Sequence, residues 1–118
     1  MGEAGDQMDA ETIGELLEDE YARSILAAIS VESLSAEELA EECDASPPTV
    51  YRRLNRLQEH DLIDEEQIPS PDGHHYRRFS ARLEQVTIEL QDGSYAVSIE
   101  RTETDAVDRF TKLYEGLR

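Results

Sequence analysis

Two closely spaced helix-start signals constrain the fold of this chain more than any other feature of its sequence. Ser35 and Glu38 form a capping box, in which the hydroxyl and the carboxylate satisfy unpaired amides at the start of a helix. Ser46 is placed to cap a following helix, whose first turn accepts Pro47 because the missing amide hydrogen has no acceptor there. The sequence therefore predicts two short helices joined by a tight turn between about Leu34 and Leu57.

The spacing within this segment is typical of a helix-turn-helix. A small residue, Ala40, stands where the two helices must cross, and Asp44 occupies the turn, where its side chain tolerates a left-handed backbone. The second helix turns three apolar residues inward: Val50, Leu54 and Leu57. In such an arrangement the second helix can enter the major groove of DNA.

A first helix and a hairpin are predicted on either side of this motif. An apolar stripe predicts one helix from about residue 9 or 12 to 29. The segments 62–68 and 75–80 are predicted strands, and the proline- and glycine-containing residues 69–73 form the turn between them. The helix-turn-helix is therefore expected to continue directly into a β-hairpin, or wing.

A second hairpin and a last helix are predicted after the wing. With Asp92-Gly93 as a two-residue turn, Val86 pairs with Ile99, Ile88 with Val97, and Leu90 with Tyr95. A two-stranded hairpin is marginal alone, so its apolar face is expected to cover either the last helix, residues 104–117, or another subunit. The predicted fold class is α+β: a winged helix-turn-helix with an additional β-hairpin and a C-terminal helix.

The length of 118 residues fits one compact domain. We expect residues 1–8 to form a flexible acidic N-terminus and residues 9–82 the winged helix-turn-helix. Residues 83–118 are expected to be a dimerisation extension of the same domain. The lone Cys43 and the absence of a long apolar run favour a cytoplasmic protein.

The formal net charge of −17 opposes binding to nucleic acid, yet the charge is unevenly distributed. Residues 1–45 contain fourteen acidic residues and a single arginine, whereas residues 46–82 contain six acidic and six basic residues. The acid-rich, lysine-poor composition resembles that of proteins from salt-accumulating halophilic archaea, so we interpret the acidity as an adaptation of solvation. The neutral middle third carries two groups of arginines that call for a function.

Residues 46–54, with the sequence Ser-Pro-Pro-Thr-Val-Tyr-Arg-Arg-Leu, are followed by Leu57 and Leu62-Ile63. This run resembles the ArsR-type winged helix-turn-helix of prokaryotic repressors, and the likeness extends over about Ile13 to Ser80. The resemblance implies a promoter-binding homodimer whose wing lies along the DNA backbone or the adjacent minor groove.

Candidate DNA-binding residues follow from this placement, because arginine can bond guanine edges or hold phosphates. In the second helix of the motif they are Ser46, Pro48, Thr49, Tyr51, Arg52, Arg53 and Arg56, and in the hairpin His75, Arg77 and Arg78. The alternatives are a solvated arginine face and an ordinary polar hairpin tip. The resemblance also suggests that the first and last helices form the dimer interface, through Ile13, Leu17, Val107, Phe110, Leu113, Tyr114 and Leu117.

Three other functions are considered. A winged-helix module that binds protein, with little DNA binding, is the main alternative. A metal- or redox-responsive repressor is a third, although Cys43, His60, His74 and His75 lack the clustered spacing of a metal site. No enzyme and no cofactor are expected, because the sequence has no glycine-rich phosphate loop and no nucleophile with a matched base.

Overall fold

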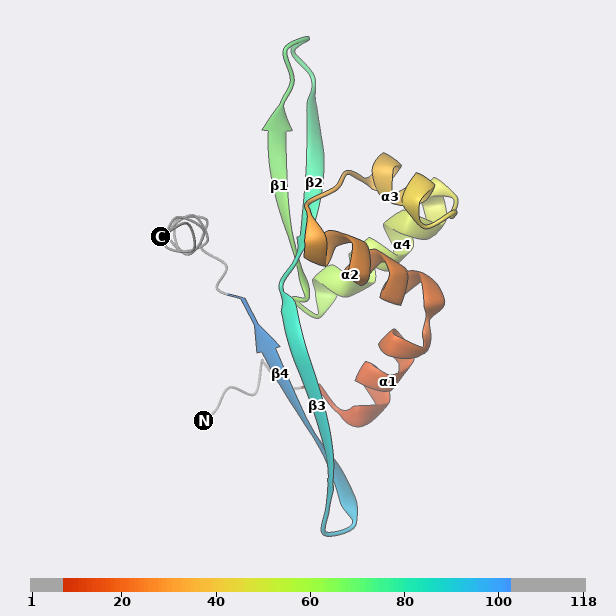
Figure 1. Cartoon of the computed structure of the whole chain (residues 1–118), viewed down its shortest axis with the longest axis vertical. Coiled ribbons are helices and arrows are strands. Elements are labelled where there is room, and N and C mark those ends of the chain that lie inside the picture. The colour runs from red at the N-terminus through yellow and green to blue at the C-terminus, as the bar shows by residue number, and fades with distance from the viewer. Residues whose placement is uncertain (1–7, 103–118) are drawn as a thin grey trace.

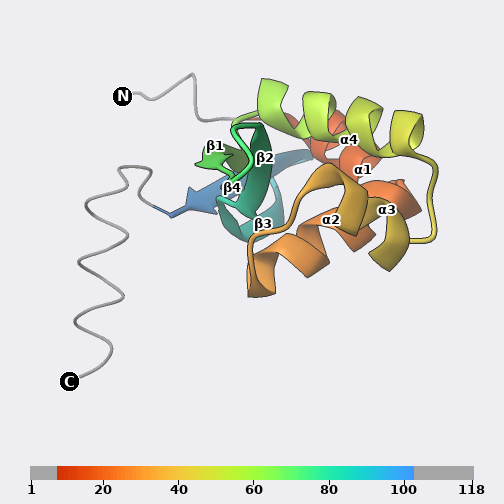
Figure 2. The ribbon, with the colours of Figure 1, turned by 90° about the horizontal axis from the view of Figure 1, so that it is seen from above.

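The computed structural model describes residues 8–102, which form helices on one side and two β-hairpins on the other (Figures 1 and 2). The elements are α1 (Ala10–Glu18), α2 (Glu20–Val31), α3 (Ala36–Glu42), α4 (Pro47–Glu59), β1 (Ile63–Pro69), β2 (His75–Ala81), β3 (Leu83–Gln91) and β4 (Ser94–Arg101). This is the predicted α+β class, with a helix-turn-helix followed by a wing. The predicted last helix and residues 1–7 lie outside the described residues.

The helix-turn-helix consists of α3 and α4 and begins at the predicted caps. The Ser35 hydroxyl accepts from the Glu38 amide at 3.2 Å, and the Glu38 carboxylate accepts from the Ser35 amide at 2.9 Å. The Thr49 amide donates to the Ser46 hydroxyl at 3.3 Å at the start of α4. Asp44 adopts a φ of 53°, so the predicted left-handed turn residue is confirmed.

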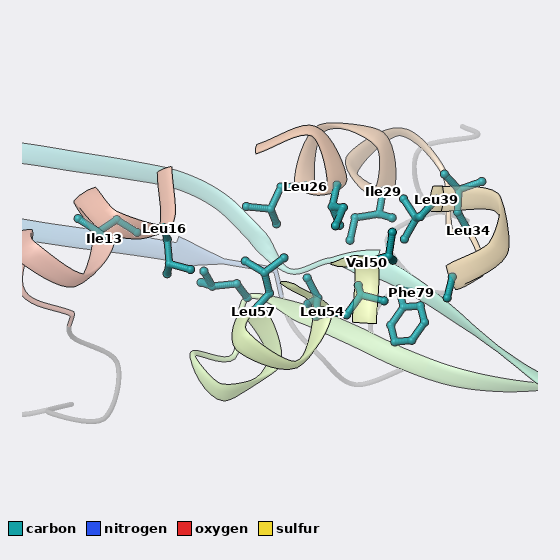
Figure 3. Packing of buried hydrophobic residues seen from close by; sticks show 14 residues of the cluster. Ile13, Leu16, Leu26, Ile29, Leu34, Leu39, Val50, Leu54, Leu57 and Phe79 are labelled. Atoms are coloured by element: carbon teal, nitrogen blue, oxygen red, sulfur yellow. The ribbon is translucent and has the colours of Figure 1, made fainter. Parts of the chain in front are cut away.

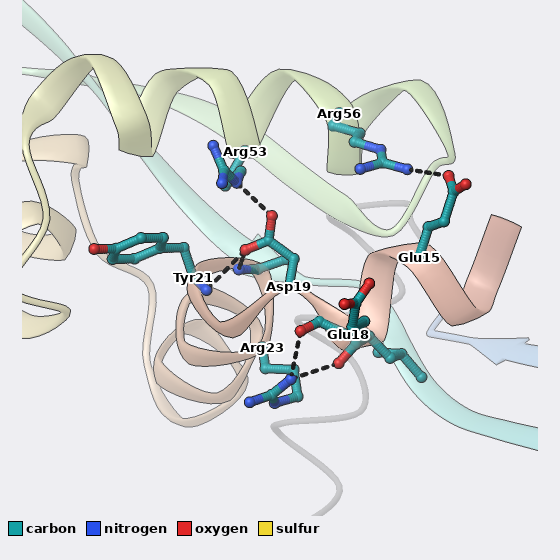
Figure 4. Close-up of polar contacts among 9 residues, drawn as sticks. Glu15, Glu18, Asp19, Tyr21, Arg23, Arg53 and Arg56 are labelled. Atoms are coloured by element: carbon teal, nitrogen blue, oxygen red, sulfur yellow. Dashed lines mark hydrogen bonds and ion pairs between the residues drawn. The ribbon is translucent and has the colours of Figure 1, made fainter.

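The prediction of one continuous first helix is wrong, because the chain breaks at Asp19 into α1 and α2. The Asp19 carboxylate accepts from the amides of Tyr21 and Ala22 at 2.9 and 3.1 Å, which starts a new helix. Arg23 closes the preceding helix by donating to the carbonyls of Leu17 and Glu18 (Figure 4). One of the many acidic residues of this segment, Asp19, is therefore a helix cap.

Asp19 should make folding stability depend on pH. Burial alone raises its pKa, but the Ala22 amide and Arg53 outweigh burial and hold the pKa below its usual value. A lowered pKa in the folded state gives stability that is present above pH 4 and is lost as pH falls through the folded value. We expect Asp19→Asn, which keeps a capping side chain, to lower the free energy of unfolding by about 1–2 kcal/mol at pH 7.

In urea titrations the Asp19→Asn deficit should shrink as the pH is lowered from 7 towards 3. Comparing the variant with the parent chain cancels the titration of the many other carboxylates. A deficit that is the same at pH 7 and pH 3 would contradict the role of the Asp19 charge.

One hydrophobic core lies between the helices and the base of the wing (Figure 3). Its fully buried side chains come from α1, α2, α3, α4 and the segment before β1: Ile13, Leu16, Ile25, Leu39, Val50, Leu54, Leu57 and Leu62. The inward face predicted for α4 is confirmed. Because the buried stripe of α4 fixes its rotation about its own axis, the opposite stripe must face outward.

The wing pairs β1 with β2 in antiparallel register, from Ile63 with Ala81 to Pro69 with His75. Its base is joined to the helices by a two-way backbone bridge between Leu34 and Phe79, with N–O distances of 3.0 and 2.8 Å. Phe79 is buried in the core. The wing is therefore anchored at its base, while its turn projects beyond the helices (Figure 1).

The second hairpin, β3 and β4, has the predicted register, and Asp92 and Gly93 both have positive φ in its turn. It extends in the direction opposite to the wing (Figure 1). Its inner end is tied to the end of α4, because Arg101 donates to the carbonyls of His60 and Asp61 at 3.0 and 2.9 Å. A cation on these carbonyls also favours the helix dipole.

Candidate nucleic-acid interface

The outward surface of α4 divides into a crest and two flanks. The crest consists of the exposed residues Pro48, Arg52, Asn55 and Glu59. Arg53 and Arg56 form the flank that faces α1 and α2, and Tyr51 and Gln58 form the flank that faces the wing. The rotation that buries Val50, Leu54 and Leu57 produces all three strips at helical spacing.

Arg53 is held by the protein itself. Its Nε lies 2.7 Å from Asp19 Oδ2, its side chain is only 25% exposed, and its guanidinium lies 5.6 Å from the centre of the Tyr21 ring (Figure 4). The pair joins α4 to the cap of α2. Sequence reasoning grouped Arg53 with the DNA-binding arginines, whereas the structure gives it a partner between two helices.

Arg56 also faces a carboxylate, in a more open setting. Its Nη2 lies 3.1 Å from Glu15 Oε1 of α1, with side-chain exposures of 37% and 65% (Figure 4). An ion pair this exposed is worth little, about 0–1 kcal/mol, so another anion can replace Glu15 at small cost.

Arg52 differs from its two neighbours. It is exposed on the crest, and within residues 8–102 no hydrogen bond or ion pair occupies its guanidinium. It lines a shallow hollow with Arg53, Asn55 and Arg56, which Asp19 and Glu59 border. Arg52 is thus the arginine of α4 that can meet an external anion or a base edge without first leaving a partner.

A second hollow lies between the helix-turn-helix and the wing, and Arg77 is among the residues that line it. Arg77 Nη1 lies 3.2 Å from Glu65 Oε2, and its guanidinium is 5.9 Å from the centre of the Tyr51 ring. Glu65 Oε1 accepts from Gln58 Nε2 at 2.6 Å. One carboxylate therefore connects α4, β1 and β2 and holds the wing arginine towards the helix.

The pKa values of Glu65 and Arg77 follow from the same contacts. The Gln58 hydrogen bond, followed by Arg77, lowers the pKa of Glu65 although burial opposes the shift. The Glu65 hydrogen bond raises the pKa of Arg77. Both groups are charged near neutral pH, and Glu65 therefore competes with any phosphate for Arg77.

The other sequence candidates are placed less uniformly. Ser46 and Thr49 are engaged with each other at the α4 cap, with 3.0 Å between their hydroxyl oxygens. His75 is exposed and lines the hollow that contains Arg77. Arg78 is half-buried opposite Glu66, and because strand residues alternate, it projects from the other face of the wing.

The residues predicted for the dimer interface are only partly described. Ile13 is fully buried in the core of its own chain, so its side chain is not accessible to a partner in this structure. Leu17 is half-buried against the same core. The remaining residues of that prediction, Val107, Phe110, Leu113, Tyr114 and Leu117, lie outside the described residues.

Within residues 8–102, no group of three or more His, Cys, Asp or Glu side chains is arranged to hold a metal ion. Burial, followed by the charge of Glu42, raises the pKa of the Cys43 thiol. A raised pKa lowers the fraction of reactive thiolate, which disfavours Cys43 as a redox sensor.

Sequence reasoning missed the carboxylates that pair with these arginines: Glu15, Asp19 and Glu65. It also missed the Gln58 amide, which donates to Glu65. Glu65 was detectable in principle, since strand alternation places it on the face of β1 that carries Ile63. Glu15 and Asp19 gave no such signal, because they stand in a sequence dense in acidic residues.

Comparison with known proteins supports the motif. Residues 17–66, from the end of α1 into β1, match a family described as "Helix-turn-helix domain". No curated protein matches the sequence. Among solved structures, a double mutant of ZitR from Lactococcus lactis, in its apo form, is 22% identical with a TM-score of 0.44.

That likeness covers 60% of this chain and about half, 51%, of the ZitR chain. In the part of the chain that the structure describes, no helix has the length and apolar character needed to cross a membrane.

Proposed function

We propose that this protein is a sequence-specific, DNA-binding transcription regulator that acts as a dimer at promoters and carries out no catalysis. In this proposal α4 enters the major groove with Pro48, Arg52 and Asn55, and the wing lies on the adjacent backbone with His75 and Arg77. The observation that carries the proposal is Arg52, which is exposed on the outward side of α4 and has no hydrogen-bond or ion-pair partner within residues 8–102.

The charge distribution supports this placement. The acidic residues of 1–45 include those of α1 and α2, whereas α4 and the wing belong to the neutral segment 46–82. DNA would therefore meet the neutral surface of a strongly acidic protein. Because counterion release is weak in molar salt, base contacts should provide more of the specificity than they do in basic regulators.

A dimer is proposed because operators of helix-turn-helix proteins are commonly two-fold, with recognition helices about 34 Å apart. Within the described residues, Leu17 is the part of the predicted interface that retains exposed surface. The segment 104–117 would contribute the rest through its apolar residues.

Selection of DNA from a random pool, in concentrated KCl, tests the proposal. We expect enrichment of an inverted repeat whose half-sites are about one helical turn apart. The same sequence should appear under sharp promoter peaks when the tagged protein is immunoprecipitated with its DNA. If wild-type protein that is folded by circular dichroism enriches no sequence, the proposal fails.

A protein-binding module is the second candidate. It is favoured by the pairing of Arg53, Arg56 and Arg77 with carboxylates and by exposed apolar side chains on the second hairpin. This alternative predicts no DNA enrichment together with capture of a specific protein. A metal- or redox-responsive repressor is the third and predicts DNA release on addition of metal or oxidant.

A further inference from the structure

The second hairpin has an apolar face that its own domain covers only in part. Val86, Val97 and Ile99 are half-buried against the core. Farther along the same face, Ile88, Leu90 and Tyr95 are 48, 66 and 64% exposed. The register places all six residues in adjacent pairs, so the exposed group continues the buried one without interruption.

The opposite face of this hairpin is polar, with exposed residues such as Gln85, Glu89, Gln91 and Ser98. A hairpin with one apolar and one polar face is built to lie on something, because two strands alone are marginally stable in water. The outer half of β3–β4 extends beyond the four described helices, which leave it uncovered, and Met8 and Asp9 border it at Tyr95 (Figure 1).

We propose that the outer half of this face binds residues 104–117 of a second copy of the chain. The apolar residues of that segment are Val107, Phe110, Leu113, Tyr114 and Leu117, a spacing that predicts one side of a helix. The inference rests on the dimer in the proposed function and names the surface that the segment would meet.

The direction of β4 favours a second copy over the same chain. β4 runs from the exposed tip back towards the helices and ends at Arg101 (Figure 1). The Thr102 amide then donates to the Arg82 carbonyl at 2.7 Å, which keeps the backbone paired beyond the strand. The chain thus leaves at the end of the hairpin that is far from Leu90 and Tyr95. In a two-fold dimer, the partner's segment could reach the tip without the chain turning back along its own hairpin. The same contact would then occur twice.

Charge also favours this occupant. Residues 104–117 contain three acidic and two basic residues, a net charge of −1, whereas the whole chain has a net charge of −17. A nearly neutral segment can approach an acidic domain with less repulsion than α1 or α2 of a second copy would meet.

The apolar surface is sufficient for a dimer. Three exposed hairpin side chains and five from the segment would bury roughly 60–120 Å² each, from a transfer energy of about 1.5–3 kcal/mol per side chain at about 25 cal/mol per Å². Two symmetric contacts would then bury roughly 1,000–2,000 Å², the range of stable protein interfaces.

Limited trypsin digestion of the full chain tests this inference, because Arg109 and Lys112 lie inside the segment. We expect both sites to be protected in the dimer. Ile88→Asp with Leu90→Asp should produce a monomer by sedimentation and at least about tenfold faster cleavage at both sites. Slow cleavage after Arg23 and Arg52 would show that the variant remains folded.

Gln85→Asp with Gln91→Asp is the matched control, because it adds the same charges to the polar face of the same strand. The control should remain dimeric and protected. Fast cleavage at Arg109 in the wild-type chain, or an Ile88→Asp/Leu90→Asp variant that stays protected, would overturn the inference. Protection that persists in a monomer on dilution would assign the hairpin to its own segment and would also overturn it.

The hairpin contact and the proposed DNA-binding function can fail independently of each other. A protected dimer that selects no DNA would defeat the regulatory function and leave the hairpin contact standing. A monomer that selects DNA would do the reverse.

Discussion

Arg52→Ala is expected to weaken binding to the selected DNA by about 10- to 100-fold and to leave folding stability within about 0.5 kcal/mol of wild type. The reason is the position of Arg52 on the exposed crest of α4, where no contact within the described residues depends on its guanidinium. An arginine that bonds a base edge contributes about 1–3 kcal/mol of discrimination, which corresponds to this loss. Fluorescence anisotropy with a labelled operator fragment measures the loss.

Arg53→Ala is the matched control, because it removes the same side chain one position along the same helix. Arg53 is held 2.7 Å from Asp19, with its side chain 25% exposed. Its loss should lower the free energy of unfolding by about 1–3 kcal/mol, because a partly buried carboxylate loses its charged partner. Under conditions in which both variants are fully folded, the DNA affinity of Arg53→Ala should be much closer to that of wild type than the affinity of Arg52→Ala.

If both variants lose DNA binding equally at equal folded fraction, the assignment of separate roles is wrong. If Arg52→Ala binds like wild type, the crest of α4 is not the reading surface. Both substitutions together therefore test the rotation of α4 as well as the function.

Local sequence rules predicted much of this fold because each acts within a few residues. The Ser35 box, the Ser46 cap, the left-handed Asp44 and the Asp92-Gly93 turn are all in place. The register of β3 with β4 followed from matching apolar residues across that turn. At each of these positions, backbone chemistry decides the structure without reference to distant parts of the chain.

The arginine partners could not be predicted in the same way. Arg53 meets Asp19 and Arg56 meets Glu15 across sequence separations of 34 and 41 residues. With 28 acidic residues in the chain, composition offers many possible partners for each arginine and selects none of them. Only the packing of α1 and α2 against α4 decides which carboxylate faces which guanidinium.

The break at Asp19 explains why the prediction of one continuous first helix was wrong. An apolar stripe continues through residues 13–29, so periodicity alone favours one helix. The cap that ends α1 and starts α2 is stabilised by Arg23 and by the distant Arg53. A local cap, reinforced by one tertiary contact, thus interrupted a helix that the apolar stripe alone would have continued.

Glu15→Gln with Glu65→Gln is expected to raise DNA affinity about tenfold at low salt. In the free protein these carboxylates lie 3.1 Å from Arg56 and 3.2 Å from Arg77, and a phosphate must displace them before either arginine contacts DNA. Exposed pairs of this kind are worth up to about 1 kcal/mol each, or about fivefold in affinity, so two together allow a gain of up to about 25-fold, and the expected tenfold lies within that limit. Neutral glutamine keeps the shape of each side chain and removes the competing charge.

The salt dependence distinguishes this mechanism from a general loss of negative charge. If Arg56 and Arg77 both gain phosphate contacts, the plot of log affinity against log salt should steepen by up to about 0.9 per arginine. Glu89→Gln removes one negative charge, as each of the two single substitutions does, but from the outer part of β3, at the end of the molecule opposite to the wing tip, and it is compared with those single variants (Figure 1). It should change affinity only slightly and leave the slope as in wild type.

An equal gain from Glu89→Gln would reduce the effect to net charge and would remove any special role for the paired carboxylates. A gain confined to Glu15→Gln and Glu65→Gln would mean that carboxylates of the protein itself limit DNA binding by α4 and the wing. Two arginines would then be held by internal anions until a phosphate replaces them. In that case the high negative charge would favour DNA that engages Arg52 first, because Arg52 is the arginine of α4 that has no partner among the described residues before the exchange.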